Sequence, residues 1–323
     1  MAGENNALLL VVGVTVVIGA LIAYSSSMVV IEENTFKDKK ILERGMDLPV
    51  IWLYMDTSEL NSRSWADYMG RSSYAINLPF LNLCYQTIVA KNKEKYRVEV
   101  IGGLADLARR FGGWEALPVP LRNNLASVGE AELTWIRAAV LAKWGGLWLH
   151  PATVCLKPFP NYPSDKIVFF GTDSGETYAG ANGTEAPGLR CLWSPKPEHP
   201  FFKKWEAISR DRLDAQGGGK QFRGDEKWEV RQLGGEFVNE VTYTPHAELT
   251  RKKGGRRIQL EDLLAAGQQG VLPFDILEKS LYVPIPWPEL RENRNFGWFV
   301  RMSEHQILES DLVISHLIRT ALL

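Results

Sequence analysis

Apolar and polar positions fall into blocks along the chain, and the first block predicts a membrane segment. Residues 7–24 form an apolar run of eighteen residues without a charged side chain. At 1.5 Å per residue such a helix is about 27 Å long, close to the thickness of the hydrocarbon core of a bilayer. The uncharged stretch continues to residue 31, which allows the helix to tilt. The pattern predicts a transmembrane anchor over residues 1–31.

A cleaved signal peptide and a buried core helix are the alternatives to a retained anchor. A signal peptide begins with a basic segment, whereas the opening MAGENN contains neither Lys nor Arg. The run is also apolar on all sides, which favours a membrane span over a core helix. Basic residues follow the span at Lys37, Lys39, Lys40 and Arg44. The positive-inside rule then places the C-terminal domain in the cytoplasm, so we interpret the glycosylation sequon at Asn182 as incidental.

The charged residues 32–48 predict a linker, and residues 49–323 alternate between short apolar runs and helical periodicity. Buried strands are expected over residues 49–55, 96–101, 147–149, 154–156, 167–171 and 281–283. Helices are expected over residues 78–91, 104–111, 200–213, 228–241, 258–266 and 307–322. Strands that alternate with helices predict an α/β domain with a mostly parallel sheet flanked by helices.

The best-defined helix is expected to begin after Ser127. The spacing from Ser127 to Glu130 predicts a capping box. Apolar residues then recur on one helical face, at Leu133, Ile136, Val140 and Trp144. The pair Gly145-Gly146 suits a left-handed helix end, and the strand over residues 147–149 follows at once.

Charge and cysteine content narrow the classes of function. Lys and Arg total 37 and Asp and Glu total 38, so the net charge of −1 provides no basic excess for neutralising nucleic-acid phosphates. The three cysteines are far apart and form no C-x-x-C pair, which favours buried thiols over a disulfide framework or a zinc site. The chain also contains no P-loop, nucleophile elbow or H-E-x-x-H motif.

Residues 131–159 contain a frame of helix, glycine turn, strand and K-P. Its defining positions are Arg137, Leu141, Gly145, Gly146, Trp148, Lys157 and Pro158. This frame resembles the DXD-type glycosyltransferases, a family that includes capsular polysaccharide synthesis proteins, and the run from Ile51 to Tyr54 resembles that family's first strand. The resemblance covers residues 49–210. It implies a GT-A fold that binds a nucleotide sugar at the carboxyl ends of the sheet strands.

The resemblance also implies a nucleotide-sugar pocket. Its residues would be Trp52, Tyr54, Thr134, Arg137, Trp148, His150 and Ala152. Family members hold Mg²⁺ or Mn²⁺ with paired aspartates, because hard cations prefer oxygen ligands. Here His150, Pro151 and Ala152 occupy those positions, and Thr134 stands where an upstream Asp is typical. No metal cofactor is therefore expected, and Mn²⁺ or Mg²⁺ would be needed only if transferase activity remains.

Other charged residues offer substitutes for the missing metal site. The basic candidates are Arg137, Lys157, Arg190, Arg251, Lys252, Lys253, Arg256 and Arg257. The last five form a dense basic cluster whose alternative interpretation is a solvated loop. Asp173, Asp225 and Glu226 are acidic candidates for a displaced metal site, although acids in polar loops are common.

Three hypotheses about function follow. The favoured one is a membrane-anchored pseudoenzyme that serves as a structural or accessory component of an assembly, with protein partners and the membrane bound through residues 7–31. The second is an active transferase that uses a nucleotide sugar without the usual metal. The third is a tethered module that binds glycans without turnover. Trp287, which lies between prolines, is either an exposed partner contact or part of a packed edge.

Overall fold

The computed structural model describes residues 48–55, 79–123, 126, 128–162, 165–172, 187–217, 226–244, 247–249, 258–267, 272, 274, 276 and 279–323. The chain divides into two compact units, Met1–Leu48 and Pro49–Leu323. The predicted anchor and its basic flank lie outside the described residues. Across the ranges given above, no helix combines the length and the apolar character that a membrane crossing requires.

A six-stranded mixed sheet forms the centre of the second unit. Its strands are β1 (Val50–Met55), β2 (Arg97–Gly102), β3 (Gly146–Leu149), β5 (Ile167–Thr172), β6 (Pro187–Ser194) and β7 (Val241–Thr244). They lie in the order β2-β1-β3-β6-β5-β7. The pairs β1–β2, β1–β3 and β5–β7 are parallel, whereas β6 runs antiparallel to both β3 and β5. The predicted α/β class with a mostly parallel sheet is confirmed.

Strand β1 is buried on both faces, as its continuous apolar run predicts. Successive side chains of a strand point to opposite faces. Trp52 and Tyr54 therefore join one apolar cluster, and Ile51 and Leu53 join another. The two clusters occupy opposite sides of the sheet.

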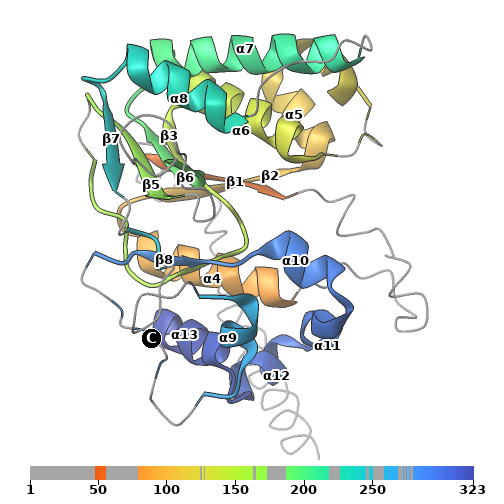
Figure 1. Cartoon of the computed structure of the whole chain (residues 1–323), viewed down its shortest axis with the longest axis vertical. Coiled ribbons are helices and arrows are strands. Elements are labelled where there is room, and N and C mark those ends of the chain that lie inside the picture. Colours follow the sequence, from red (N-terminus) through yellow and green to blue (C-terminus); the bar gives the residue numbers. More distant parts are fainter. Residues whose placement is uncertain are drawn as a thin grey trace, which may run out of the picture. The chain divides into compact units, whose positions relative to one another are not determined.

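Four helices cover the face that carries Trp52: α5 (Gly103–Phe111), α6 (Glu130–Trp144), α7 (Pro200–Gly217) and α8 (Glu226–Glu236). Figure 1 shows these helices on one side of the sheet, with α7 outermost. Their apolar residues form a single core with those of the sheet. The helix predicted over residues 104–111 is thus confirmed as α5.

The opposite face is covered by α4 (Pro79–Asn92), which lies between the sheet and the C-terminal elements (Figure 1). Those elements are the two-stranded sheet of β4 (Thr153–Cys155) and β8 (Tyr282–Pro284) and the helices α9 (Leu260–Leu264), α10 (Trp287–Glu292), α11 (Gly297–Val300), α12 (Glu304–Glu309) and α13 (Val313–Leu322). Trp287 is partly buried and stacks on Phe80 at 6.3 Å, so it belongs to a packed edge.

Helix α6 differs from its prediction in two respects. It begins after Gly129, whose N–H donates to the Glu132 carboxylate at 2.9 Å, so the cap lies two residues beyond Ser127. It is also buried on every side from Thr134 to Ala142, where a single apolar face was expected. The reason is its position between the sheet and α7, where the Trp135 indole donates to Glu206 at 2.9 Å.

Gly145 and Gly146 join α6 to β3 in a backbone conformation that disfavours other residues. Their φ angles are +65° and +91°. A Cβ on Gly146 would lie 2.5 Å from the Val50 carbonyl oxygen, because β3 passes directly beside β1. The Trp52 indole N–H donates to the Gly145 carbonyl at 2.9 Å, and this hydrogen bond links the turn to β1.

Pairing with distant strands changes the secondary structure near β7. The predicted helix over residues 228–241 is wrong at its end, since α8 stops at Glu236 and Val241 begins β7. Residues 241–244 pair in parallel with β5 and form hydrogen bonds with its backbone N–H and carbonyl groups. The local sequence does not reveal this pairing, because β5 lies about seventy residues earlier in the chain. Strand β6 was likewise not predicted, and it pairs with two neighbouring strands.

The C-terminal helix predicted over residues 307–322 is two helices, α12 and α13. Ser310 between them is extended, with a ψ of 154°. The Arg319 guanidinium donates to the carbonyls of Leu308 and, at 2.9 Å, Ser310. This side chain satisfies backbone acceptors at the end of α12, so the break is stabilised by a long-range contact.

Candidate functional site

Three parallel strands bring their carboxyl ends to one edge of the sheet. Strands β2, β1 and β3 lie side by side in parallel, and they end at Gly102, Met55 and Leu149. His150 follows β3 directly. Ligands of open α/β sheets bind at such an edge, so the end of β3 is the candidate site.

Four of the predicted pocket residues share one face of this sheet. Trp52 and Tyr54 alternate along β1, and Trp148 and His150 continue the same alternation along β3. The register pairs Trp52 with Trp148 across the two strands. Their face is the one covered by α6, where the Arg137 guanidinium lies 5.9 Å from the centre of the Trp148 ring.

Arg137 is a buried cation with a partner on its own helix. Its side chain is 2% exposed, and its Nη2 lies 3.1 Å from a Glu130 carboxylate oxygen. The seven-residue spacing places both side chains on one face of α6. The opposite charges of Glu130 and Arg137, seven residues apart in a predicted helix, already indicated this pair in the sequence. Our prediction of the pocket did not include Glu130.

His150 is fixed by the backbone on both sides. Its N–H donates to the Arg190 carbonyl at 2.8 Å, so the two residues are cross-strand neighbours at the end of the β3–β6 ladder. Its Nδ1 accepts the Ala152 N–H at 3.1 Å, which assigns the ring proton to Nε2. Loss of hydration, followed by the charges of Arg190 and Arg137, holds the pKa of His150 well below its usual value.

The segment after His150 is bonded to the strand pair β4–β8. The Ala152 carbonyl accepts the Ile285 N–H at 3.0 Å, and the Ile285 carbonyl accepts Nη1 of Arg190 at 2.9 Å. The Ala152 side chain is fully buried in the apolar cluster of the C-terminal helices. Its methyl group therefore points away from the cluster that contains Trp148.

Thr134 and Trp52 use their polar groups within the fold. The Thr134 hydroxyl donates to the Glu130 carbonyl at 2.8 Å, one turn earlier in α6. The Trp52 indole is committed to Gly145, as described above. The remaining polar groups of this face therefore include those of Tyr54, Trp148, His150 and Arg137, and Arg190 lies opposite His150 on β6.

The remaining charged candidates lie elsewhere or are not described. Lys157 follows β4, and its backbone N–H donates to the Leu281 carbonyl at 3.1 Å. The basic cluster at 251–257 and the acids Asp173 and Asp225 lie outside the described residues. Glu226 opens α8, but its side chain is not among those described.

The residues at the end of β3 do not fit a divalent cation. His150 presents a protonated Nε2 there, Pro151 and Ala152 have no ligating atom in their side chains, and two guanidiniums repel a cation. Within the ranges that the structure describes, no group of three or more His, Cys, Asp or Glu side chains could hold a metal ion.

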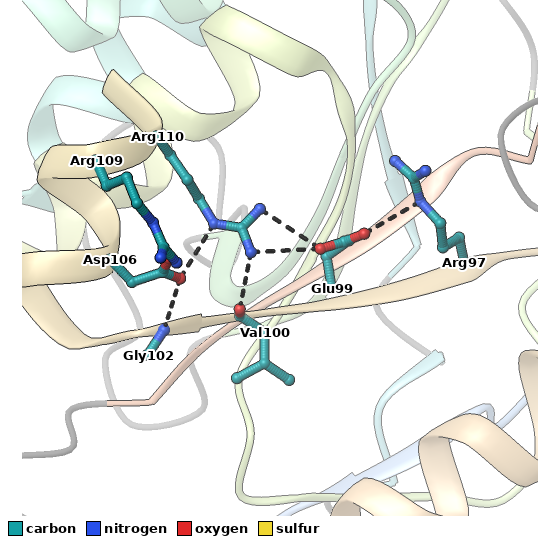
Figure 2. Close-up of polar contacts among 7 residues, drawn as sticks. All are labelled: Arg97, Glu99, Val100, Gly102, Asp106, Arg109 and Arg110. Carbon is teal, nitrogen blue, oxygen red and sulfur yellow. Dashed lines mark hydrogen bonds and ion pairs between the residues drawn. The ribbon is translucent and has the colours of Figure 1, made fainter. Parts of the chain in front are cut away.

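A second charged cluster lies on β2 and α5, and β1 separates β2 from β3 in the sheet (Figure 2). Glu99 lies 3.3 Å from Arg97 and 3.4 Å from Arg110, and Arg110 also bonds Asp106 at 3.1 Å. Burial raises the pKa of Asp106, but hydrogen bonds from Arg109, the Gly102 N–H and Arg110 outweigh it and lower the pKa. Paired charges of this kind protect an edge strand from pairing with another chain.

Comparison with known proteins gives only distant likenesses. No family model and no curated protein sequence match the chain. The glycosyltransferase GlyE of Streptococcus pneumoniae matches with a TM-score of 0.32 and 8% identity over 62% of this chain and 46% of GlyE. A structure of the galactosyltransferase LgtC with donor and acceptor sugar analogues matches with a TM-score of 0.33 and 13% identity, over 60% of this chain and 72% of LgtC. The chain thus spans less than half of GlyE, and neither match assigns a role to a residue here.

Proposed function

We propose that residues 49–323 are a glycosyltransferase-like module without metal-assisted transfer, which serves as an accessory component of a membrane-associated assembly. The observation that carries the proposal is the end of β3. An imidazole, a proline ring and a buried methyl group stand there, flanked by Arg137 and Arg190. A divalent cation on a departing diphosphate supplies several kcal/mol. Losing about 4 kcal/mol of this stabilisation slows a reaction by about 10³.

Calorimetry and turnover measurements on the full-length chain in detergent test this proposal. UDP- and GDP-sugars are titrated with and without Mn²⁺, and release of the nucleotide is followed over hours. We expect no turnover and no gain in affinity from Mn²⁺. Affinity that rises with Mn²⁺, together with release of nucleotide, would overturn the proposal.

Arg137 and Arg190 favour one alternative, an active transferase that stabilises the leaving diphosphate with guanidiniums in place of a metal. This alternative predicts turnover that persists in EDTA and falls at least tenfold in Arg190→Gln. The exposed Arg109 supplies a matched control, because Arg109→Gln removes the same charge from α5. Turnover that both variants lower equally would count against a role for Arg190.

The membrane tether is part of the same proposal. It is supported by the uncharged residues 7–24 and by the basic residues after them, which together favour a single span with the C-terminal domain in the cytoplasm. We expect the full-length chain to stay in the membrane pellet after alkaline extraction and a variant lacking residues 1–31 to leave it. Protease digestion of sealed vesicles tests the orientation.

A further inference from the structure

The turn between α4 and β2 carries a cluster of lysines. Lys91 lies in the last turn of α4, and Lys93 and Lys95 are exposed in the turn that follows. Glu94, also exposed, stands between them. Three lysines and one glutamate give residues 91–95 a formal charge of +2. We call residues 91–95 the basic turn.

Buried neighbours hold the basic turn in place. The backbone N–H groups of Lys95 and Tyr96 both donate to the Asn92 carbonyl at 2.9 Å. The Asn92 side chain is buried, and its Oδ1 accepts the Phe159 N–H at 2.8 Å. The Tyr96 hydroxyl donates to the Pro160 carbonyl at 2.6 Å. The exposed lysines therefore extend from a turn that is anchored at both ends.

The basic turn lies where the chain enters the domain. The Arg97 N–H donates to the Pro49 carbonyl at 3.0 Å, at the start of the parallel pair β1–β2. Pro49 is the first residue of the second unit. In the sequence, only the charged residues 32–48 separate Pro49 from the predicted span. Chain connectivity thus keeps this end of the sheet close to a membrane that holds the anchor.

The charge of the basic turn matches an anionic bilayer. The cytoplasmic leaflet of a membrane is negatively charged, and each Lys near its surface strengthens binding about fivefold. The positive-inside rule assigns this domain to the same side of the membrane. The next charges along β2 leave the sign unchanged, because Arg97 lies 3.3 Å from Glu99 and the two charges balance.

We propose that the basic turn docks the domain on the bilayer that holds its anchor, through the anionic headgroups of lipids such as phosphatidylserine. The proposal rests on the membrane tether of the proposed function and adds a second contact to it. Strand β1 has six residues and is about 20 Å long, so its carboxyl end and the end of β3 lie at the opposite edge of the sheet. Docking through the basic turn therefore leaves the candidate site clear of the bilayer surface.

Site-specific fluorescence of the full-length chain in nanodiscs tests the proposal. The three native cysteines are buried, so a cysteine introduced at an exposed position is labelled selectively. Glu94→Cys places the probe in the basic turn. Asn295→Cys places a control probe beside α11, whose Phe299 ring lies 5.3 Å from that of Phe80 at the opposite end of α4. A lipid with a spin-labelled headgroup quenches a probe that lies at the bilayer surface.

The lipid composition of the nanodisc should control the quenching. We expect the probe at position 94 to be quenched about threefold more with phosphatidylserine present than in phosphatidylcholine alone. High salt should abolish this difference, because it screens the charges of an exposed surface. The probe at position 295 should be quenched equally in both lipids.

Charge variants separate the basic turn from a general effect of net charge. In the chain labelled at position 94, Lys93→Gln with Lys95→Gln removes two charges and should lower the ratio of docked to free domain by about thirtyfold. Arg109→Gln with Arg301→Gln removes two exposed charges from α5 and from the end of α11, and should leave this ratio unchanged. Circular dichroism confirms that the variants are folded.

Three results would overturn the proposal: quenching at position 94 that does not depend on phosphatidylserine, equal quenching at positions 94 and 295, or docking that survives the loss of both lysines. Docking that needs an added acidic protein in place of the lipid would also overturn it and assign the basic turn to a protein partner. The tether is judged separately, by co-elution of the chain with nanodiscs. If the tether fails, sedimentation with phosphatidylserine vesicles still tests the basic turn, and the two lysine substitutions must then reduce it.

Discussion

Gly146→Ala should be among the most damaging single-methyl substitutions in this domain. Gly146 begins β3 beside β1, with a φ of +91°. An added Cβ would lie 2.5 Å from the Val50 carbonyl oxygen and 3.3 Å from the Trp52 indole nitrogen. The first contact is with backbone, so no side-chain rotation relieves it. Either β3 moves away from β1 or the glycine turn changes its path.

The magnitude follows from two costs. A non-glycine residue at positive φ costs about 1–2 kcal/mol. Forcing a backbone away from a well-packed neighbour typically costs about 1–3 kcal/mol more. Together they destabilise the domain by about 3 kcal/mol, a large part of the roughly 5–15 kcal/mol of a typical folded protein.

Urea unfolding followed by tryptophan fluorescence measures the effect. With an m-value of about 3 kcal/mol per M, the midpoint should fall by about 1 M. Gly235→Ala is the matched control, because its Cβ meets no atom within 4 Å and it lies within α8, where Ala should stabilise by about 0.5–1 kcal/mol. A Gly146→Ala variant within 0.5 kcal/mol of the wild type would refute the close approach of β1 and β3.

Three further predictions concern buried ionisable groups. Burial lowers the pKa of His150 and of His199, in each case against a usual 6.5, so the unfolded chain binds protons that the folded chain does not. The full contribution of both histidines to stability is therefore present above about pH 6.5. Acid titration should lower the free energy of unfolding by up to about 1.4 kcal/mol per pH unit for each histidine. A free energy of unfolding that does not change between pH 7 and 5 would contradict this. Arg212→Met should cost about 3–5 kcal/mol because it removes the cation that lies 3.2 Å from the buried Glu229 carboxylate. Adding Glu229→Leu should restore most of the loss in the same urea assay. The three cysteines are buried, and burial raises the pKa of Cys155 to about 12, so iodoacetamide at pH 8 should label none of them before urea is added.

The sequence by itself determined the elements whose pattern is local. The apolar run over 49–55 is the buried strand β1, and the helical periodicity over 78–91 is α4. The pair Gly145-Gly146 marked the end of α6. Each of these signals depends on residues a few positions apart, so tertiary contacts strengthen them without changing them.

Only the tertiary structure decided which segments pair and which charges meet. Strand β7 exists because residues 241–244 find β5, and α13 begins where Arg319 binds the end of α12. Arg190 reaches His150 only because β6 runs antiparallel to β3, a pairing across about forty residues of chain. The sequence predicted that the end of β3 lacks carboxylates. Which residues surround that strand end is set by long-range strand pairing, which no local pattern encodes.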